Sequence, residues 1–345
     1  MSTLPARKFR NPRAKHDFKG RTCSIASVGS YVPDRIVTNA ELEKLVDTTD
    51  DWITSRTGIK ERRIAAADEF TSDLGAKAAR RAMEKAGITA DQIDLIIVST
   101  ITPDMPFPST ACLVQQKLGA TRAAAFDLEA ACSGFIYGLE VGQQFIMSRT
   151  YDTVLVIGAE KLSSIINWKD RNTCVLFGDG AGAAILQSRP NSHGLLTACM
   201  GADGAKAELL SMPGGGSRCP ATVASVSDGL HFLRMEGKET FKSAVNAMCS
   251  AANEVLRRCE IDITQVKLVI PHQANQRIID AVGDRLGTKP GQVFVNLHKY
   301  GNTSAASVAI ALDEAVTSGQ VQRGDLVLLV VFGAGLTWGA AVIEW

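Results

Sequence analysis

The sequence lacks any long, uninterrupted apolar segment. Nowhere in its 345 residues does a hydrophobic run reach the roughly 18 to 20 residues that a membrane-spanning helix needs. No apolar stretch of the signal-peptide kind follows the basic residues at the start of the chain. We therefore expect a protein that neither enters a membrane nor is secreted, and we expect it in the cytoplasm.

The sequence also lacks paired cysteines. Its eight cysteines are scattered and none forms a C-x-x-C pair, which argues against zinc ribbons and against a disulfide framework. We expect free thiols and no metal. The cysteines are Cys23, Cys112, Cys132, Cys174, Cys199, Cys219, Cys249 and Cys259.

Charge of one sign is concentrated only at the start of the chain. Residues 1–20 hold six Lys or Arg and one Asp, a net charge of +5, whereas the remainder holds 31 basic and 35 acidic residues. We interpret residues 1–20 as a disordered leader, with organelle targeting or nucleic-acid contact as alternatives. For the folded chain we expect no nucleic-acid partner.

What the sequence does have is a regular alternation of short apolar runs and capped helical segments. With 46% hydrophobic and 21% charged residues, the chain can bury a large core. Such runs predict buried, largely parallel strands in an α/β fold. The first-half strands are expected at 23–28, 95–98, 124–127 and 154–157, and the helices at 71–86 and 109–118.

A weak internal duplication accompanies this alternation. The strand-like runs 95–98 and 268–270 are each followed by a helix that ends in Leu-Gly, and 126–127 matches 294–295. The pattern predicts two pseudo-duplicated halves, residues 21–194 and 195–345. Gly194 is the expected boundary.

Three polar segments stand at strand-to-helix junctions: 130–134 around Cys132, 271–275 around His272, and 301–304 around Asn302. Sites in α/β proteins form where the carboxyl ends of strands meet helix N-termini. A thiol, an imidazole and an amide at one such edge indicate acyl chemistry.

Each of the three residues also has a plainer interpretation. Cys132 could be an ordinary buried cysteine, His272 a structural hydrogen-bonding group and Asn302 an N-cap. In the catalytic interpretation, the helix N-terminus favours the Cys132 thiolate and keeps His272 neutral.

Six ordered motifs then give the chain a specific resemblance. From about residue 21 to residue 345 it resembles β-ketoacyl-acyl-carrier-protein synthase III, the initiating condensing enzyme of the thiolase superfamily. The resemblance implies a thiolase-like fold of two mixed-sheet halves in α/β/α/β/α layers. The motifs are DWITSRTGI at 51–59, ACSGF at 131–135, FGDGAGA at 177–183, PHQAN at 271–275, GNTSAAS at 301–307 and FGAGLTWG at 332–339.

The resemblance implies an acyltransferase that starts fatty acid synthesis by ping-pong chemistry. Cys132 would take the acyl group of an acyl-CoA, and malonyl-acyl-carrier protein would lose CO2 and attack the acyl carbon. His272 and Asn302 would stabilise the enolate. The backbone N–H groups of Cys132 and Ala334 would hold the oxyanion, although relatives commonly have glycine where Ala334 stands.

It also implies roles for residues around the catalytic group. Trp52 and Arg171 would enclose the CoA adenine, and Arg56 and Asn275 would contact the phosphopantetheine. Phe332 would line the acyl pocket, together with Phe107 from across a homodimer interface. No cofactor is implied beyond the CoA thioesters that serve as substrates.

Carrier-protein docking is implied for Lys242 and Arg277, which match the basic rim of the family. Asp284 stands where relatives often have a base, and this acid weakens the attraction to an acidic carrier.

Several alternatives to this function remain at the level of the sequence. A related condensing enzyme of a secondary-metabolite or long-chain pathway would use another acyl donor or acceptor. A Cys-His-Asn hydrolase and a non-catalytic acyl-binding protein belong to other classes. A degradative thiolase would need a second cysteine in FGAG, and an elongating synthase a second histidine.

Overall fold

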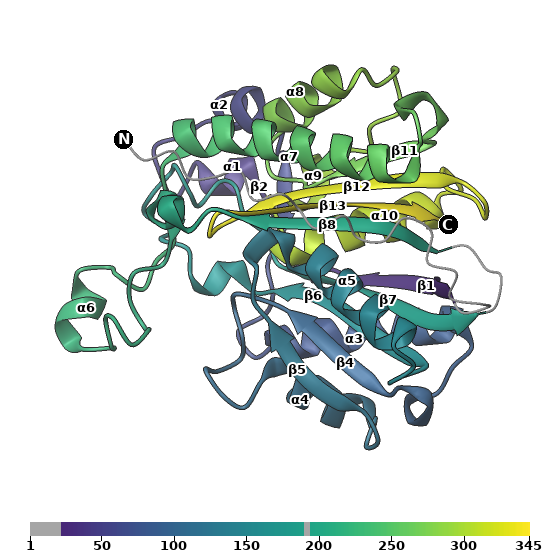
Figure 1. Cartoon of the computed structure of the whole chain (residues 1–345). Helices are drawn as coiled ribbons and strands as arrows, with labels where there is room; N and C mark the ends of the chain where they lie inside the picture. Colours follow the sequence, from purple (N-terminus) through teal and green to yellow (C-terminus); the bar gives the residue numbers. More distant parts are fainter. Residues whose placement is uncertain (1–21, 190–193) are drawn as a thin grey trace, which may run out of the picture.

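The computed structural model describes residues 22–189 and 194–345, so the predicted leader at 1–20 lies outside the described residues (Figure 1). None of the helices in these two ranges combines the length and the apolar character needed to cross a membrane.

The first sheet has five strands in the order β1-β7-β6-β4-β5. The pairs β6–β4 and β4–β5 are parallel, whereas β1 and β6 both run antiparallel to β7. The predicted positions of the strands are therefore confirmed, but the prediction that they are largely parallel is wrong, because two of the four pairings in this sheet are antiparallel. Their bounds are β1 Thr22–Tyr31, β4 Leu95–Ser99, β5 Ala124–Leu128, β6 Thr153–Glu160 and β7 Gly180–Arg189.

The second sheet repeats this order with one strand fewer, as β11-β12-β13-β8. Where β5 would have its counterpart, a single parallel bridge joins Val269 and Val293. Beyond this bridge the Gln273 side chain, and not the backbone of a neighbouring strand, bonds the chain. It donates to the Phe294 carbonyl and accepts from the Asn296 N–H. The strands are β8 Leu195–Ala202, β11 Leu268–Pro271, β12 Leu326–Gly333 and β13 Thr337–Glu344.

Helices form three layers around the two sheets (Figure 1). Helices α3 and α4 pack on the outer face of the first sheet, α7 packs on the outer face of the second beside α8, and α5 and α10 lie between the sheets. The predicted α/β/α/β/α architecture is thus confirmed. The helices are α3 Thr71–Ala86, α4 Thr110–Leu118, α5 Gly134–Met147, α7 Gly237–Cys259, α8 Gln276–Leu286 and α10 Ser307–Thr317.

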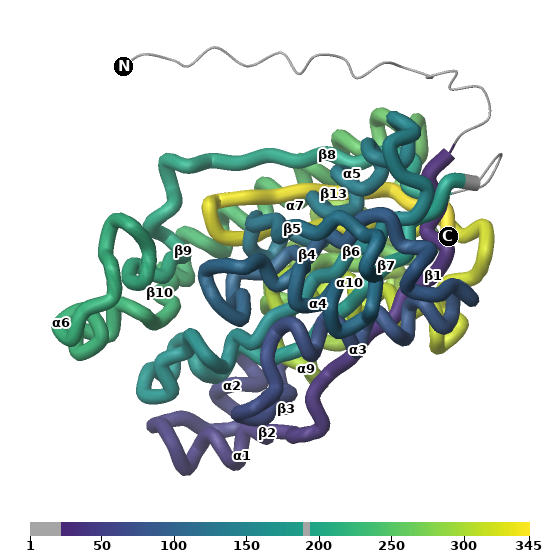
Figure 2. Tube along the Cα trace, turned by 90° about the horizontal axis from the view of Figure 1, so that it is seen from below, coloured from purple at the N-terminus to yellow at the C-terminus, as the bar shows by residue number. Residues whose placement is uncertain are grey.

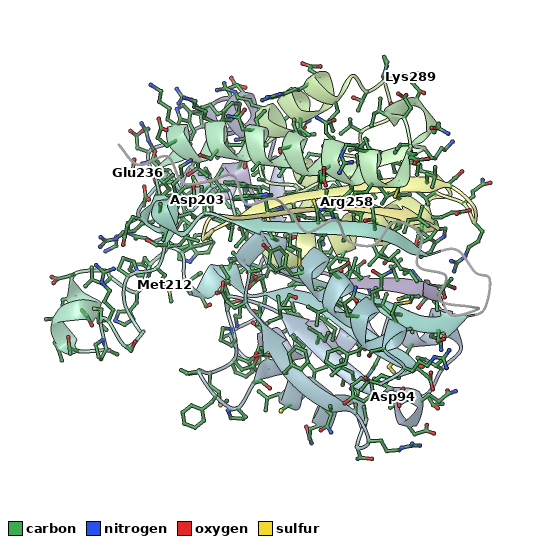
Figure 3. All side chains as sticks on the ribbon, viewed as in Figure 1. Asp94, Asp203, Met212, Glu236, Arg258 and Lys289 are labelled. Atoms are coloured by element: carbon green, nitrogen blue, oxygen red, sulfur yellow. The ribbon has the colours of Figure 1, made fainter. Side chains whose placement is uncertain are left out.

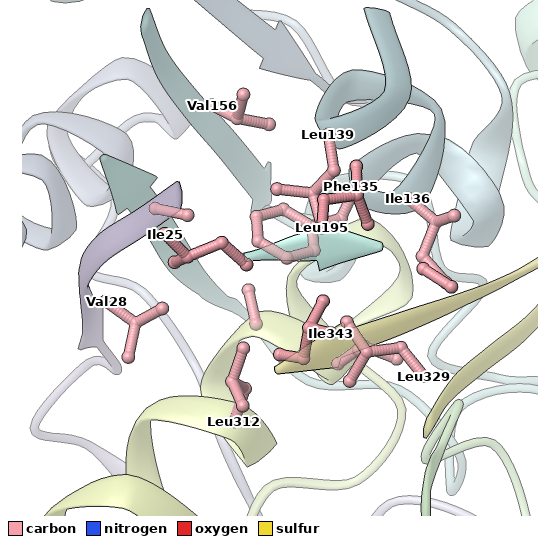
Figure 4. Close-up of a cluster of buried hydrophobic side chains, with 14 of the residues drawn as sticks. Ile25, Val28, Phe135, Ile136, Leu139, Val156, Leu195, Leu312, Leu329 and Ile343 are labelled. Carbon is pink, nitrogen blue, oxygen red and sulfur yellow. The ribbon is translucent and has the colours of Figure 1, made fainter. Parts of the chain in front are cut away.

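The central helices bury their side chains against both sheets (Figure 4). Phe135 and Leu139 of α5 belong to one cluster with Leu312 of α10, Val156 of β6 and Leu329 of β12. All five are fully buried or nearly so, and burial of each such side chain stabilises the fold by about 1.5 to 3 kcal/mol. The first turns of α5 and α10 are therefore fixed between the sheets.

Shorter elements cover one end of the molecule. The segment from Met212 through α6 to Leu233 extends away from the body, as two views show (Figures 1 and 2), and Met212 lies at its base in Figure 3. The remaining elements are α1 Asn39–Leu42, α2 Asp50–Thr57, α6 Val223–Ser227, α9 Leu297–Tyr300, β2 Ile36–Thr38, β3 Glu61–Arg63, β9 Leu210–Ser211 and β10 Arg234–Met235.

Candidate active site

Cys132, His272 and Asn302 line one cavity of about 640 Å³. Cys132 comes from the first half of the chain, and the other two come from the second. Each is buried, with at most 8% of its surface exposed. The three predicted catalytic residues are therefore brought together at the ends of the two central helices.

Cys132 lies in the 3-10 turn Ala131–Ser133, which leads directly into α5. This turn is seated on the end of β12, in the other half of the molecule. A Cβ atom on Gly333 would lie only 2.7 Å from the Cys132 backbone nitrogen, so only glycine permits this approach. The next residue, Ala334, also lines the cavity.

A second turn, Ser304–Ala306, leads into α10 in the same way. It is seated on β6 of the first sheet, where a Cβ atom on Gly158 would lie 2.3 Å from the Ala305 carbonyl oxygen. Ala131 and Ser304, which open the two turns, have φ angles of 46° and 49°. Each turn thus rests on a strand of the opposite half.

Burial raises the pKa of the Cys132 thiol to about 12. Hydrogen bonds from Ser304 and from the Cys132 backbone N–H oppose this shift without cancelling it, and the nearby Glu160 adds to it. The prediction that the helix N-terminus favours the thiolate is therefore wrong for the resting protein. Burial is the largest cause of the shift, and it favours the neutral thiol of Cys132.

His272 follows β11 directly, and its backbone N–H donates to the Val330 carbonyl oxygen of β12 at 2.8 Å. Burial lowers its pKa to about 4, so the ring is neutral as predicted. The predicted cause is wrong, however. Helix α8 begins only at Gln276, with Asn275 as its N-cap, and desolvation rather than the helix end keeps His272 neutral.

Neighbouring groups orient both polar donors of the cavity. The Nδ1 atom of His272 lies 2.6 Å from the Ser307 hydroxyl, which leaves Nε2 for the cavity. The Oδ1 atom of Asn302 accepts the Ser304 N–H at 2.8 Å, which leaves the Nδ2 amino group. Asn302 therefore accepts a backbone N–H as an N-cap residue does. Because its Oδ1 atom is bound in this way, its Nδ2 amino group remains available to donate.

Sequence reasoning missed three residues of this network: Glu160, Ser304 and Ser307. Ser304 and Ser307 stand in the GNTSAAS motif, two and five residues after Asn302. The only local signal for Glu160 is a carboxylate that ends the apolar run 154–159. A charge at the carboxyl end of a buried strand is the pattern that could have identified it.

Three of the four predicted CoA residues, Trp52, Arg56 and Arg171, form a cluster outside the cavity. Arg56 and Arg171 place their Cζ atoms 4.6 and 5.1 Å from the Trp52 ring centroid, within cation–π distance. A base stacked between Trp52 and Arg171 needs about 7 Å, twice the ordinary contact distance. Arg171 would therefore have to move outward by about 2 Å, whereas Asn275 already lines the cavity and donates to the Arg56 carbonyl.

The two residues predicted for the acyl pocket lie in different environments. Phe332 is buried and lines the cavity. Phe107 is 84% exposed and does not line the cavity of its own chain, and Met105 beside it is also exposed. Phe107 and Met105 thus place two apolar side chains on the surface of this chain.

Lys242 and Arg277, predicted to dock the carrier protein, are exposed residues next to cavity-lining ones. Lys242 follows Phe241 in α7, and Arg277 precedes Ile278 in α8. Asp284 is also exposed, about two turns further along α8. In the two described ranges, no group of three or more His, Cys, Asp or Glu side chains could hold a metal ion.

Comparisons with known proteins agree with this geometry. The family model of 3-oxoacyl-[acyl-carrier-protein] synthase III matches residues 126–204, which include Cys132. The model of the C-terminal part of the same family matches residues 256–345, which include His272 and Asn302.

Relatives match over nearly the whole chain. The β-ketoacyl-[acyl-carrier-protein] synthase III of Caldanaerobacter subterraneus is 57% identical over 321 residues, or 93% of this chain and 97% of that protein. The crystal structure of 3-oxoacyl-[acyl-carrier-protein] synthase III from Aquifex aeolicus is 48% identical with a TM-score of 0.88, covering 94% of this chain and 100% of that one. The Thermus thermophilus enzyme is 45% identical with the same TM-score, covering 93% and 99%. The chain belongs to the β-ketoacyl-acyl-carrier-protein synthase III family.

Proposed function

We propose that this chain catalyses the decarboxylative Claisen condensation of an acyl-CoA with malonyl-acyl-carrier protein, which starts fatty acid synthesis. One observation carries the proposal. A thiol at a helix start shares a cavity with two neutral donors, His272 and Asn302, whose other polar atoms are already bound. This arrangement suits one nucleophile and one enolate, in two successive half-reactions.

In the first half-reaction the Cys132 sulfur attacks the carbonyl carbon of the acyl-CoA. A tetrahedral intermediate forms, and the C–S bond to CoA breaks to leave an acyl-Cys132. The backbone N–H groups of Cys132 and Ala334 are the proposed donors to the oxyanion. One such donor typically contributes about 2.7 to 4 kcal/mol to the lowering of the barrier.

In the second half-reaction the malonyl thioester loses CO2. The electron pair of the broken C–C bond moves onto the thioester oxygen, which becomes an enolate oxygen. His272 Nε2–H and Asn302 Nδ2–H would donate to it. Because both donors are neutral, their protons stay on nitrogen while the charge develops.

The enolate carbon then attacks the acyl-Cys132 carbonyl carbon, and the thiolate of Cys132 leaves. The products are a 3-ketoacyl thioester, CoA and CO2. Each step uses only an activated thioester and groups of this chain, so we propose that the reaction needs no cofactor.

Outer residues would hold the two substrates. Trp52 and Arg171 offer aromatic and cationic surface for the CoA adenine, and Arg56 and Asn275 lead from there to the cavity, along the proposed path of the phosphopantetheine. Lys242 and Arg277 would contact an acidic carrier protein, and Asp284 would weaken that contact.

We also propose that the protein acts as a homodimer in the cytoplasm. The dimer is what the family resemblance implies, with Phe107 entering the partner's acyl pocket, and the exposed ring of Phe107 is available for such a contact. The length and branching of the primer would then depend on Phe107 as well as on Phe332.

The function is tested by following the half-reactions separately. Cys132→Ala is expected to abolish the acyl-enzyme that intact mass detects after mixing with an acyl-CoA. His272→Ala and Asn302→Ala are expected to retain acylation but lose CO2 release from malonyl-acyl-carrier protein.

Cys249→Ala is the matched control, because Cys249 is another buried thiol and does not line the cavity. It should acylate normally. Undiminished decarboxylation in both the His272 and Asn302 variants would contradict the enolate assignment, and hydrolysis without CO2 release would indicate a Cys-His-Asn hydrolase.

A further inference from the structure

Glu160 is a fully buried carboxylate that the proposed condensation leaves without a role. It ends β6, and in the described ranges its partners are neutral donors rather than Lys or Arg side chains. They are the hydroxyls of Thr102 at 2.6 Å, Ser304 at 3.0 Å and Thr100 at 3.1 Å, and the Ile101 backbone N–H at 3.2 Å. A buried carboxylate without a basic partner is costly, even when it is hydrogen-bonded. A group of this kind therefore invites a functional explanation.

The two carboxylate oxygens of Glu160 face different parts of the site. Oε2 accepts the hydroxyls of Thr100 and Thr102, which lie in the loop after β4. Oε1 accepts the Ser304 hydroxyl, in the turn that leads into α10. The Ile101 N–H lies between them, 3.2 Å from Oε2 and 3.3 Å from Oε1. Both oxygens must accept, which a carboxylate provides and a carboxamide does not.

The loop after β4, residues 100–106, forms one wall of the cavity. Thr102 is buried and does not line the cavity, and its hydroxyl holds the loop to the end of β6 by donating to Glu160 and accepting the Lys161 N–H at 2.9 Å. Without the bonds to Glu160 this wall would be free to shift. The loop residues that line the cavity are Thr100, Ile101, Pro103 and Pro106.

The Ser304 turn sets the direction of the Asn302 amide. The Ser304 N–H donates to Asn302 Oδ1 at 2.8 Å, which leaves Nδ2 to donate into the cavity. Ser304 has a φ angle of 49°, a left-handed conformation that the surrounding structure must hold in place. The bond from its hydroxyl to Glu160 Oε1 is the side-chain contact that does so. The Asn302 donor therefore depends on Glu160 through Ser304.

We propose that Glu160 is a positioning residue that fixes the 100–106 wall of the cavity and, through Ser304, the Asn302 donor. Glu160 does not line the cavity, so it acts only through the groups that it binds. The inference rests on the proposed condensation, which places the acyl group in this cavity and the enolate beside Asn302. One carboxylate then governs both the choice of primer and the rate of decarboxylation.

The test measures the two half-reactions in full-length variants at pH 8, where Glu160, whose pKa burial raises to about 7, is mostly ionised. Intact mass follows acylation by a two-carbon and by a six-carbon acyl-CoA, and the ratio of the two rates is the primer ratio. CO2 release from malonyl-acyl-carrier protein is then measured on the acylated protein. Both measurements refer to the fraction of protein that becomes acylated, so a loss of folded protein alone changes neither.

The variants on the two sides of Glu160 should separate the measurements. Thr102→Val should shift the primer ratio by about tenfold towards the six-carbon acyl group, because a wall that can move admits a longer chain, and should leave CO2 release unchanged. Ser304→Ala should lower CO2 release by about 10- to 100-fold and leave the primer ratio unchanged. Glu160→Gln should do both.

Double variants show whether each neighbour is coupled to Glu160. Adding Ser304→Ala to Glu160→Gln should slow CO2 release no further, and adding Thr102→Val should leave the primer ratio of Glu160→Gln unchanged, because effects within one hydrogen-bond network are not additive. Glu140→Gln is the matched control, since Glu140 is a partly buried carboxylate on α5 whose pKa is also raised by burial. This control should keep the wild-type primer ratio and CO2 release.

Additive losses in the double variants would overturn the positioning role but leave the acyltransferase intact. A wild-type primer ratio and CO2 release in Glu160→Gln would do the same. If Glu160→Gln fails to fold, Thr102→Val and Ser304→Ala decide the matter, because a variant that changes neither measurement, or both equally, contradicts the assignment. A wild-type protein that forms no acyl-enzyme at all would overturn the proposed function itself.

Discussion

The Nδ1 atom of His272 lies 2.6 Å from the Oγ atom of Ser307, and both side chains are buried. The same Ser307 oxygen accepts the Gln273 N–H at 3.3 Å. With this position filled, the Ser307 hydroxyl proton can be donated to Nδ1, and in that arrangement the ring carries its own proton on Nε2. Ser307 selects the tautomer that can donate into the cavity.

Ser307→Ala is expected to lower CO2 release from malonyl-acyl-carrier protein by about 10- to 100-fold, because the ring loses the bond that fixes its proton on Nε2. Acylation of Cys132 should change little. CO2 release and intact mass measure the two half-reactions. Ser27→Ala is the control, since it removes a buried 2.6 Å hydrogen bond, to the Ala82 carbonyl, far from the cavity. Equal losses in both half-reactions would contradict the assignment.

Gly333→Ala should impair acylation rather than decarboxylation. The added Cβ would lie 2.7 Å from the Cys132 nitrogen and 3.1 Å from the Ser133 nitrogen, so the turn must shift and the oxyanion donors with it. Loss of one such donor lowers rates by about 10²- to 10³-fold. Gly204→Ala, where a Cβ meets nothing within 4 Å, should retain activity. CoA release at the wild-type rate in Gly333→Ala would exclude this geometry.

Trp52→Ala should raise KM for an acyl-CoA by about 10- to 100-fold, since stacking of one base on an aromatic side chain contributes about 1 to 3 kcal/mol. The matched substrate is the same acyl group on pantetheine, which lacks the nucleotide. Its kinetics should not change in the variant. If both thioesters lose affinity equally, Trp52 supports the fold and not the adenine.

Glu160→Gln should also change how the free energy of unfolding depends on pH below neutrality. The raised pKa of Glu160 stabilises the fold at low pH, and this contribution is lost as pH rises from about 4.5 to about 7. The lowered pKa of His272 acts in the opposite direction, since its contribution is present above about 6.5 and lost as pH falls towards about 4. In the wild type the two effects largely cancel between these limits.

In Glu160→Gln the His272 effect is left uncompensated. The free energy of unfolding should then fall by about 3 kcal/mol more than in the wild type as pH decreases from 6.5 to 4.5. Urea unfolding at several pH values measures the difference. Parallel curves for the two proteins would show that Glu160 titrates normally.

Local patterns were sufficient to predict the α/β class, the strands of the first half and the three central residues, whereas the layers followed from the resemblance to a known family. The runs 95–98 and 154–157 are short, apolar and bounded by turns, and they became β4 and β6. Cys132, His272 and Asn302 follow such runs closely enough for topology to bring them together. The fold class needed no knowledge of long-range contacts.

The rest depended on contacts between distant residues. Glu160 meets Ser304 across 144 positions, and no local pattern reveals that pairing. The pKa of Cys132 depends on the burial of the site, which a helix-end argument ignores. The second-half counterpart of β5 is reduced to a single bridge, since Pro271 has no N–H to continue the pairing and the Gln273 side chain bonds the Phe294 carbonyl and the Asn296 N–H instead.

Each of the two turns, Ala131–Ser133 and Ser304–Ala306, rests on a strand of the opposite half, and this has a consequence for biosynthesis. The N-terminal half of a chain leaves the ribosome first. Cys132 therefore emerges well before Gly333, against which its turn rests, and before the donors His272 and Asn302. A nascent chain would hold the thiol without the means to use it. The complete cavity therefore forms only when the final strands have been synthesised and packed against the first half.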